Sequence, residues 1–429
     1  MSNYYRSLKS LVLMVLAMSI CTSAFSKEVI TISTSTDFLR KVSKSNIIYD
    51  IKCDVNLNGS TVKIPANCIL RFTSGSISNG KLEGSQTFID NSSNYEIFNN
   101  VSIADKPFQF TNDYVYVDWF SGRSDSDRMQ QAIVFSKKNR NPIHFLSREY
   151  EFNSTVIVDM NHLMLAGTTA GGEYGELGTK ISASASFSSK YTGSPLFLIV
   201  GEPEKSGAEL GAASGRITGI SFSTNRKNDA IQFKLAPAPS RPFYIDHCSF
   251  YKCATAIRVL DNGGSTALGF LYVENCTLTG NIWNVVASGR HSLMGLYFCK
   301  NVAEQCDGNI NLGYSEVFSP KPYDAPRPKN TSSSASAVIT ICDNLLEGTV
   351  DCIYISGGKC IVNVERNYFE TSRRQFVVMT FTHPASIVTF NNNYIAQDDD
   401  VSISLRNCKY IVQSDIKKTL FKTVQASSL

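Results

Sequence analysis

A six-residue segment returns through the second half of this 429-residue chain. Its fourth position falls at steps of 28, 25, 43, 23 and 26 residues, on Cys248, Cys276, Asn301, Asn344, Asn367 and Asn393. A repeat of this length predicts a solenoid, because one repeat cannot bury an apolar face alone and must stack on its neighbours. In such a solenoid, these small polar residues would stack on one another from one coil to the next.

The residues inside each repeat predict strands rather than helices. Each copy has a β-branched or aromatic stretch, a turn with Asn, Cys or Asp, and a second apolar stretch near nine residues on, at Ile257, Val285, Ile310, Ile353 and Phe376. Asn is a poor helix former that tolerates a left-handed turn between strands. Coils of ~25 residues at ~3.3 Å per residue hold about three strands, and adjacent coils lie ~4.8 Å apart. The chain is therefore predicted to be all-β, as a right-handed parallel β-helix.

A second stretch resembles the pectate-lyase-like superfamily of single-stranded right-handed β-helix proteins. Val117–Gly122 followed by Ser124–Ile133 is similar to that family's entry motif, a Gly/Asp-rich turn leading into a capping helix. Ile143–Tyr150 and Leu163–Gly167 are similar to the strands that follow it. The match covers most of residues 115–408 and departs at Ser147–Glu149, where the family has Pro and Gly.

The capping helix is expected to start from Ser124 or Asp125. Met129, Ala132 and Ile133 are expected to face the core and close the apolar end of the solenoid. The resemblance spreads over lyases, hydrolases, epimerases and proteins without catalysis, so the fold alone does not select a reaction.

The first residues indicate export. Arg6 and Lys9 precede an apolar run, and Ala24–Ser26 offers a cleavage site, which predicts a signal peptide over 1–26. The alternative is a lipoprotein acylated at Cys21, although Ile20 is bulky for that site. We expect a secreted, periplasmic or cell-surface protein without a membrane span.

The remaining chain divides into three parts. Residues 27–113 read as a small β cap or starter coils, 114–408 as the β-helix and 409–429 as a polar tail. Residues 168–216 and 314–336 read as insertions, and long loops on a regular scaffold are where binding often occurs.

Composition narrows the partners. The net charge of +4 with 18% charged residues lacks the basic stripe of a nucleic-acid binder. Of 12 cysteines, 11 remain after removal of Cys21. The pairs Cys248/Cys276 and Cys299/Cys342 share positions on adjacent coils, and we favour stacking over disulfides. No cofactor is indicated; calcium is compatible with the family, but Asp398–Asp400 reads better as an acidic surface turn.

Candidate catalytic residues lie at the end of the repeating strand. Asp246 and Glu274 are expected ~4.8 Å apart on adjacent coils, near the spacing of paired carboxylates in retaining glycosidases. His247, Lys300 and Arg366 continue that edge and would serve a lyase as base or as charge stabiliser. A solvated ladder of mutually compensating charges fits the same residues. His291 lacks the Gly-His-Gly context of polygalacturonase-type enzymes.

Aromatic side chains supply candidate sugar contacts, because a ring joins apolar area to a polar handle. Trp283, Tyr174 and Tyr323 are the candidates for substrate binding, whereas Trp119 is expected in the core. The sequence thus predicts a secreted β-helix protein that binds polysaccharide, with lyase or hydrolase activity as one option. The alternative is a non-catalytic surface or adhesion solenoid that binds glycan or protein.

Overall fold

The computed structural model describes residues 27–91, 96–104, 106–159, 162–168, 178–190, 193–200, 214–234, 242–260, 268–287, 293–313, 338–349, 351–371, 375–396, 402–413 and 425–428. The chain forms two compact units, residues 1–93 with 97–111 and residues 94–96 with 112–429. Within the described part, no helix is long and apolar enough to cross a membrane.

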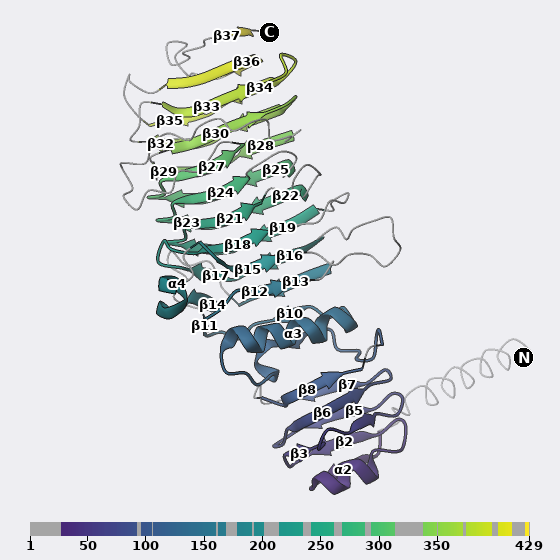
Figure 1. Cartoon of the computed structure of the whole chain (residues 1–429). Coiled ribbons are helices and arrows are strands. Elements are labelled where there is room, and N and C mark those ends of the chain that lie inside the picture. Colours follow the sequence, from purple (N-terminus) through teal and green to yellow (C-terminus); the bar gives the residue numbers. More distant parts are fainter. Residues whose placement is uncertain are drawn as a thin grey trace, which may run out of the picture. The chain divides into compact units, whose positions relative to one another are not determined.

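The first unit consists of short parallel strands (Figure 1). One sheet holds β1 (Val29–Ile32), β2 (Ile48–Ile51), β5 (Ile69–Phe72) and β7 (Phe88–Asn91). In the other, β6 (Ile77–Glu83) pairs with β3 (Val55–Asn56), β4 (Thr61–Lys63) and β8 (Phe98–Ile103). Helix α2 (Ser35–Lys41) starts at its Thr34 cap. Asn58, Asn79 and Asn100 have φ of 49°, 52° and 54°, the left-handed conformation that asparagine tolerates best after glycine.

Helix α3 (Asp125–Asn139) begins the second unit's solenoid, as predicted. Ser124 caps it by accepting a hydrogen bond from the Asp127 backbone N–H, and Met129, Ala132 and Ile133 are buried. The helix packs on the 3-10 turn η1 (Val117–Trp119) and on the first strands of the solenoid. The helix therefore covers the apolar end of the first coil, whereas within the solenoid each coil is covered by its neighbours.

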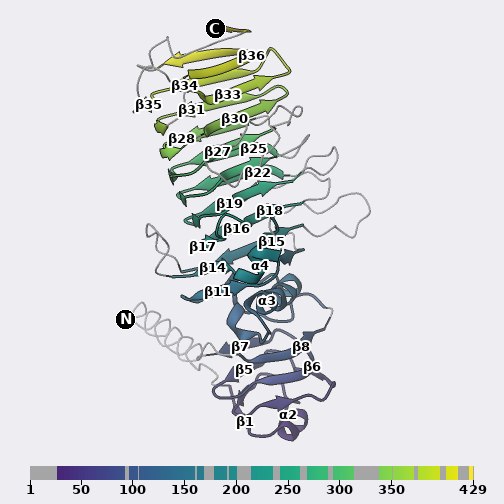
Figure 2. The ribbon, with the colours of Figure 1, turned by 60° about the vertical axis from the view of Figure 1, so that its left-hand side comes forward.

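The second unit is a parallel β-helix, which confirms the predicted fold class (Figures 1 and 2). Each coil contributes one strand to each of three parallel sheets. The first sheet holds β9 (Val115–Tyr116), β10 (Ile143–His144), β13 (His162–Ala166), β16 (Ser214–Thr218), β19 (Pro242–Asp246), β22 (Leu268–Glu274), β25 (Leu293–Cys299), β28 (Val338–Cys342), β31 (Ile361–Glu365) and β34 (Ile387–Asn391).

The other two sheets follow the first around each coil. The second sheet holds β11 (Glu149–Phe152), β14 (Lys180–Ala183), β17 (Ser221–Ser223), β20 (Ser249–Tyr251), β23 (Thr277–Thr279), β26 (Val302–Glu304), β29 (Leu345–Thr349), β32 (Tyr368–Thr371) and β35 (Tyr394–Ile395). The third sheet holds β12 (Val156–Val158), β15 (Pro195–Ile199), β18 (Asp229–Phe233), β21 (Thr255–Val259), β24 (Trp283–Ala287), β27 (Gly308–Leu312), β30 (Asp351–Gly357) and β33 (Gln375–Phe381).

The polar column that revealed the repeat lies inside the solenoid. The Asn344 Oδ1 accepts from the Asn301 backbone N–H at 2.8 Å, and its Nδ2 donates to the Phe298 carbonyl at 2.8 Å. Asn301, Asn367 and Asn393 repeat the same two bonds on their own coils. Each asparagine therefore satisfies a backbone donor and a backbone acceptor of the coil before it, which a buried turn requires.

Cysteines take the same place where the column starts. The Cys276 thiol lies within hydrogen-bonding distance of the Ile245 carbonyl, at 3.6 Å, which is the acceptor position that the asparagine amides use on later coils, and of the Glu274 carbonyl at 3.3 Å. The Cys248 thiol lies likewise within hydrogen-bonding distance of the Ile217 carbonyl. All cysteines among the described residues are free, in agreement with stacking rather than bridging.

Three boundaries differ from the sequence interpretation. Residues 168–216 are not a simple insertion, because they contain β14, helix α4 (Ala185–Lys190) and β15, with β14 and β15 in register with the coils on both sides. In the coil after Ile353, the in-register residue is Val377 rather than Phe376. Strand β36 (Ser402–Gln413) runs past 408, pairing first with β33 and then with β34, and β37 (Gln425–Ser428) pairs with it.

Candidate functional site

The outer face of the first sheet carries three rows of side chains along the solenoid, because its strands are parallel and in register. The charged row is Asp246, Glu274, Cys299, Cys342 and Glu365. Two residues upstream, the tyrosine row is Tyr244, Tyr272, Tyr297, Thr340, Asn363 and Thr389. Two further upstream, the apolar row is Pro242, Phe270, Gly295, Val338, Ile361 and Ile387.

Three tyrosines stack on one another in the tyrosine row. The ring centroids of Tyr244 and Tyr272 are 4.7 Å apart with 19° between the planes, and those of Tyr272 and Tyr297 are 4.6 Å apart with 6° between the planes. Partial burial and the neighbouring phenols raise the pKa of Tyr272, so its hydroxyl remains a hydrogen-bond donor at neutral pH. Tyr244 is 40% exposed at one end of the stack.

Phe270 lies across the backbone of the next coil. A Cβ atom on Gly295 would lie 2.4 Å from the Phe270 Cδ1, so only glycine at that position admits the ring. Phe270 remains partly exposed, and its centroid is 6.4 Å from that of Tyr297. The glycine therefore creates an aromatic surface beside the tyrosine stack.

Asp246 is held in an ion pair with the preceding coil. Arg216 donates to it through Nε at 2.7 Å and Nη2 at 3.0 Å, and the Thr218 hydroxyl donates at 2.6 Å. Burial opposes the charge, but the hydrogen bonds from Arg216, Thr218 and His247 outweigh it and lower the pKa of Asp246. The carboxylate is thus ionised and engaged.

Glu274 is in register with Asp246, as the repeat predicted. The two residues are neighbours along the charged row, but the Asp246 carboxylate bonds to Arg216 on the other side. Glu274 is partly exposed. Retaining glycosidases need one carboxyl group protonated and the other ionised, and Asp246 has the environment of the ionised one only.

His247, Lys300 and Arg366 occupy left-handed turn positions, with φ of 51°, 59° and 52°. The His247 backbone N–H donates to the Glu274 carbonyl, and equivalent bonds follow at Lys300 and Arg366. Their side chains leave the turn toward solvent. The Arg366 guanidinium is taken by Asp343, at 2.7 and 2.9 Å, and by Glu365 at 3.1 Å.

His247 makes one side-chain contact that bears on catalysis, with the Asp246 carboxylate. Its Nδ1 lies 2.9 Å from the Asp246 Oδ1, and its side chain is 61% exposed. A carboxylate on Nδ1 favours the tautomer that leaves Nε2 as an acceptor, the arrangement of a general base.

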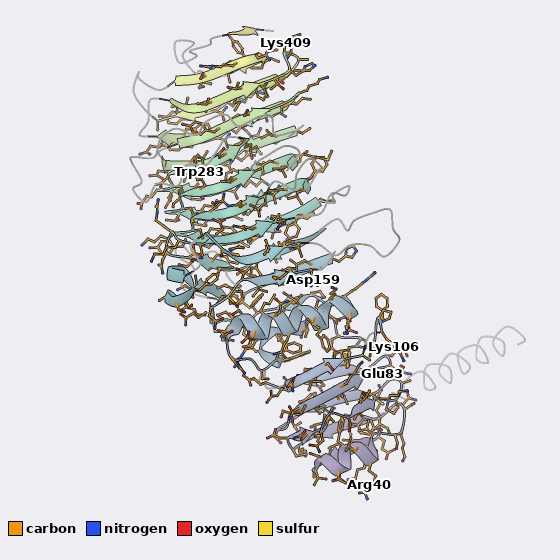
Figure 3. All side chains as sticks on the ribbon, in the orientation of Figure 1. Arg40, Glu83, Lys106, Asp159, Trp283 and Lys409 are labelled. Atoms are coloured by element: carbon orange, nitrogen blue, oxygen red, sulfur yellow. The ribbon has the colours of Figure 1, made fainter. Side chains whose placement is uncertain are left out.

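Trp283, labelled in Figure 3, is the first residue of β24 in the third sheet and is only 7% exposed. It packs with Val286 and Tyr354, with its ring centroid 6.1 Å from that of Tyr354 in a T-shaped contact. A Cβ atom on Gly308 would lie 2.2 Å from the indole ring. Trp283 is therefore a packing residue in this structure, with little area for a sugar.

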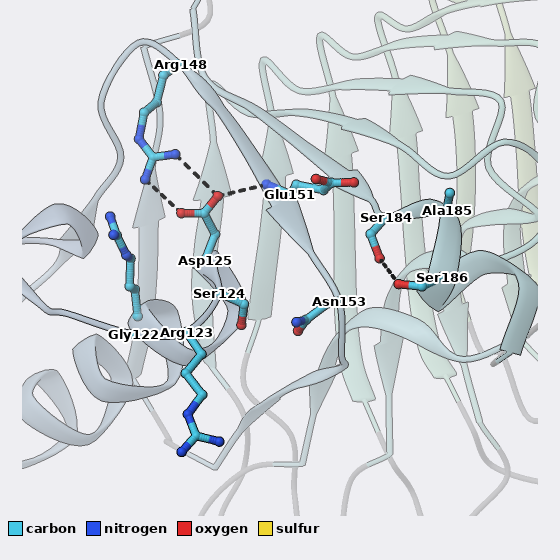
Figure 4. A pocket seen from close by; sticks show the side chains of 11 residues that line it. Gly122, Arg123, Ser124, Asp125, Arg148, Glu151, Asn153, Ser184, Ala185 and Ser186 are labelled. Atoms are coloured by element: carbon cyan, nitrogen blue, oxygen red, sulfur yellow. Dashed lines mark hydrogen bonds and ion pairs between the residues drawn. The ribbon is translucent and has the colours of Figure 1, made fainter.

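A polar cavity of about 690 Å³ lies beside the start of α3 (Figure 4). Arg148 lines one wall of this cavity, and it belongs to the segment Ser147–Glu149, which departs from the family pattern. Its guanidinium donates to Asp118 and Asp125 at 2.9 Å each and lies 3.6 Å above the Tyr150 ring centroid. Burial opposes its charge, but the two carboxylates outweigh this and raise the pKa of Arg148. These contacts tie the capping helix to β11.

The other candidate sugar contacts, Tyr174 and Tyr323, lie outside the described residues, as do His291, Asp398–Asp400 and the expected signal peptide with Cys21. In the described part of the chain, no group of three or more His, Cys, Asp or Glu residues is arranged to hold a metal ion. The sequence interpretation missed the tyrosine row. Each member precedes the Cys/Asn column by four residues, so extending the repeat upstream would have revealed it.

Comparisons with known proteins add little to this geometry. No family model matches the chain, and no curated protein matches it. Among solved structures, the chain is similar to ORF18 of Geobacillus virus E2, with 14% identity and a TM-score of 0.28. The similarity covers 74% of this chain and 60% of the viral chain, so this chain spans less than two thirds of that protein.

Proposed function

We propose that the protein is an exported β-helix of the pectate-lyase-like type that binds polysaccharide on the outer face of its first sheet. The observation that carries the proposal is the stack of Tyr244, Tyr272 and Tyr297 beside the exposed part of Phe270. Sugar rings have apolar C–H faces and hydroxyl edges; the tyrosine hydroxyls offer partners for the edges, and the exposed part of Phe270 offers apolar area for a face. Exposed aromatic residues that are scattered singly need no partner, whereas a contiguous group of several is typical of an interaction surface.

Retention on immobilised polysaccharides tests this proposal. The wild-type protein should be retained on at least one of a panel of plant, algal and bacterial glycans. Combined Tyr244→Ala, Tyr272→Ala and Tyr297→Ala substitutions should abolish retention, because they remove the aromatic row.

Tyr394 supplies a matched control on another sheet. It is 62% exposed and stacks on Tyr368 at 5.4 Å and 20°. Tyr394→Ala should leave retention unchanged. Equal loss in both variants would show that exposed tyrosines in general, rather than this row, govern retention and would refute the proposal.

Cleavage is a second candidate function, favoured by the contact between Asp246 and His247. In a lyase, His247 Nε2 would remove the C5 proton beside a uronate carboxylate, and Lys300 would neutralise developing charge on that carboxylate. The C4=C5 double bond would form as the glycosidic oxygen leaves C4 and takes a proton from water. Hydrolysis by Asp246 and Glu274 is less well supported, because Asp246 is held ionised by Arg216.

Turnover assays separate these outcomes. New ultraviolet absorbance that disappears in His247→Gln would establish elimination, whereas reducing ends without absorbance would indicate hydrolysis. Retention of glycan with silence in both assays would leave the protein as a binding solenoid.

A further inference from the structure

The polar part of the tyrosine row continues for three coils beyond the tyrosines. Thr340, Asn363 and Thr389 occupy the same register position and are partly exposed. The Thr389 hydroxyl lies 2.6 Å from the Asn363 Oδ1, so these two side chains hold each other in place. Hydroxyl and amide groups thus continue the line of tyrosine hydroxyls.

The apolar row accompanies it over the same coils. Val338 and Ile387 are partly exposed, and Ile361 is 45% exposed. Two parallel strips result, one apolar and one polar, separated by two residues or about 7 Å along each strand. This pairing resembles the two-sided character of a sugar ring more closely than that of a purely apolar partner.

The formal charges nearest the strips are largely compensated within the protein. Arg216 pairs with Asp246, and Arg366 pairs with Asp343 and Glu365. Among the other described residues, Glu274 and Lys300 are of opposite sign, and Lys409 lies in register with Ile387 at the end of the apolar row. A face whose charges pair internally gives little attraction to either sign of charged polymer.

The register of the strands sets the direction in which a ligand can follow the rows. The rows run along the solenoid axis with one side chain per coil, and five steps of ~4.8 Å from Tyr244 to Thr389 cover about 24 Å. A ligand that uses the whole surface must be extended and must lie along that axis.

We propose that the ligand is an uncharged, extended polysaccharide that lies along the solenoid axis over the strip from Tyr244 to Thr389. This inference rests on the proposed glycan-binding function and adds the ligand's charge class, its direction and the far end of its site. Short chains bind over the tyrosines, and longer chains also cover Ile361 and Thr389.

Calorimetry with defined oligosaccharides tests the inference. The probes are neutral cello-, manno- and xylo-oligosaccharides from disaccharide to octasaccharide, with oligogalacturonates and oligoalginates as acidic counterparts. For at least one neutral series, affinity should rise tenfold or more between the disaccharide and the hexasaccharide and should be the same at low and high salt. Acidic chains should bind more weakly.

Ile361→Lys examines the far end of the strip. It should weaken binding of the neutral octasaccharide several-fold and leave the disaccharide unchanged, since only the longer chain reaches that residue. Ile157→Lys is the matched control, because Ile157 is 47% exposed on the third sheet. That variant should bind both probes as the wild type does.

The outcomes distinguish the two levels of the proposal. Tighter, salt-sensitive binding of acidic chains would overturn the neutral class, leave glycan binding intact and favour the second candidate function, elimination on a uronate chain. Affinity independent of length, or equal effects of both lysine variants, would overturn the axial arrangement. Failure of every oligosaccharide and every polysaccharide to bind would reject the proposed function itself.

Discussion

Two columns of side chains run along the same solenoid and have opposite roles. The inner column of Asn301, Asn344, Asn367 and Asn393 is buried, and its amides bond to backbone groups of the neighbouring coil. The outer column of Tyr244, Tyr272 and Tyr297 is at least partly exposed and stacks ring on ring. The repeat that reveals the fold therefore marks its structural column, and the column proposed to bind ligand lies four residues upstream.

The inner column should give the largest effect on stability. Asn344→Leu leaves the Asn301 N–H and the Phe298 carbonyl buried without partners, at about 1–3 kcal/mol each. We expect the free energy of unfolding to fall by roughly 3 kcal/mol on that scale. Urea denaturation followed by circular dichroism measures it.

Asn363→Ala is the matched substitution on the outer face of the next coil. Asn363 is partly exposed, and surface changes of this kind usually shift stability by less than about 0.5 kcal/mol. Equal effects of the two variants would mean that the inner column is not the structural one.

The outer column should show the reverse pattern. Tyr272 lies in the middle of the stack, so Tyr272→Ala should reduce glycan affinity about tenfold, which corresponds to about 1.4 kcal/mol. It should reduce stability by less than about 3 kcal/mol, since two aromatic contacts of ~0.5–1.5 kcal/mol are lost. Calorimetric titration and urea denaturation on the same variant separate the two effects, and loss of stability without loss of affinity would contradict the assignment.

Acid should weaken the ion pair between Asp246 and Arg216. The folded-state pKa of Asp246 is lowered, because hydrogen bonds from Arg216 and Thr218 outweigh its burial. A group with a lowered pKa contributes stability above its unfolded pKa of about 3.9 and loses that contribution as the pH falls through the folded value. Denaturation midpoints should therefore drop below about pH 4, and less so in Asp246→Asn. An unchanged acid profile in that variant would show that the Arg216 pair contributes no pH dependence.

The smallest effect should come from exchanging residue types within the inner column. The Cys276 thiol lies within hydrogen-bonding distance of the Ile245 carbonyl, where later coils use an asparagine amide. Cys276→Asn should be nearly neutral in urea denaturation, while Cys276→Leu removes the donor and costs about 1–3 kcal/mol. Strong destabilisation by asparagine would show that thiol and amide are not equivalent in the column.

The sequence predicted the architecture because stacked coils impose one register on every position. The spacing of Cys248 and Cys276 predicted that Asp246 and Glu274 would be neighbours, and the Ser124 cap followed from helix chemistry. The register does not predict which partner a side chain contacts outside the sheet. Asp246 turns to Arg216, from a segment that had been interpreted as an insertion.

Trp283 shows the same limit for an aromatic residue. The sequence indicated that this residue could point outward, but its burial depends on the residues that pack around it, here Val286 and Tyr354. Gly308 on one side and Tyr354 two coils away were not visible as its neighbours until the register was known. The tyrosine row, by contrast, can be predicted from the repeat, because each tyrosine lies four residues before the Cys/Asn column.

Tyrosine footprinting is the most direct measurement of the central claim that the outer column binds glycan. The wild-type protein would be modified by iodination with and without a saturating neutral polysaccharide, and each tyrosine would be quantified by peptide mass spectrometry. Tyr244, Tyr272 and Tyr297 should be protected, and the modification of Tyr394 should be unchanged. Protection of Tyr394 with continued modification of the outer column would contradict it.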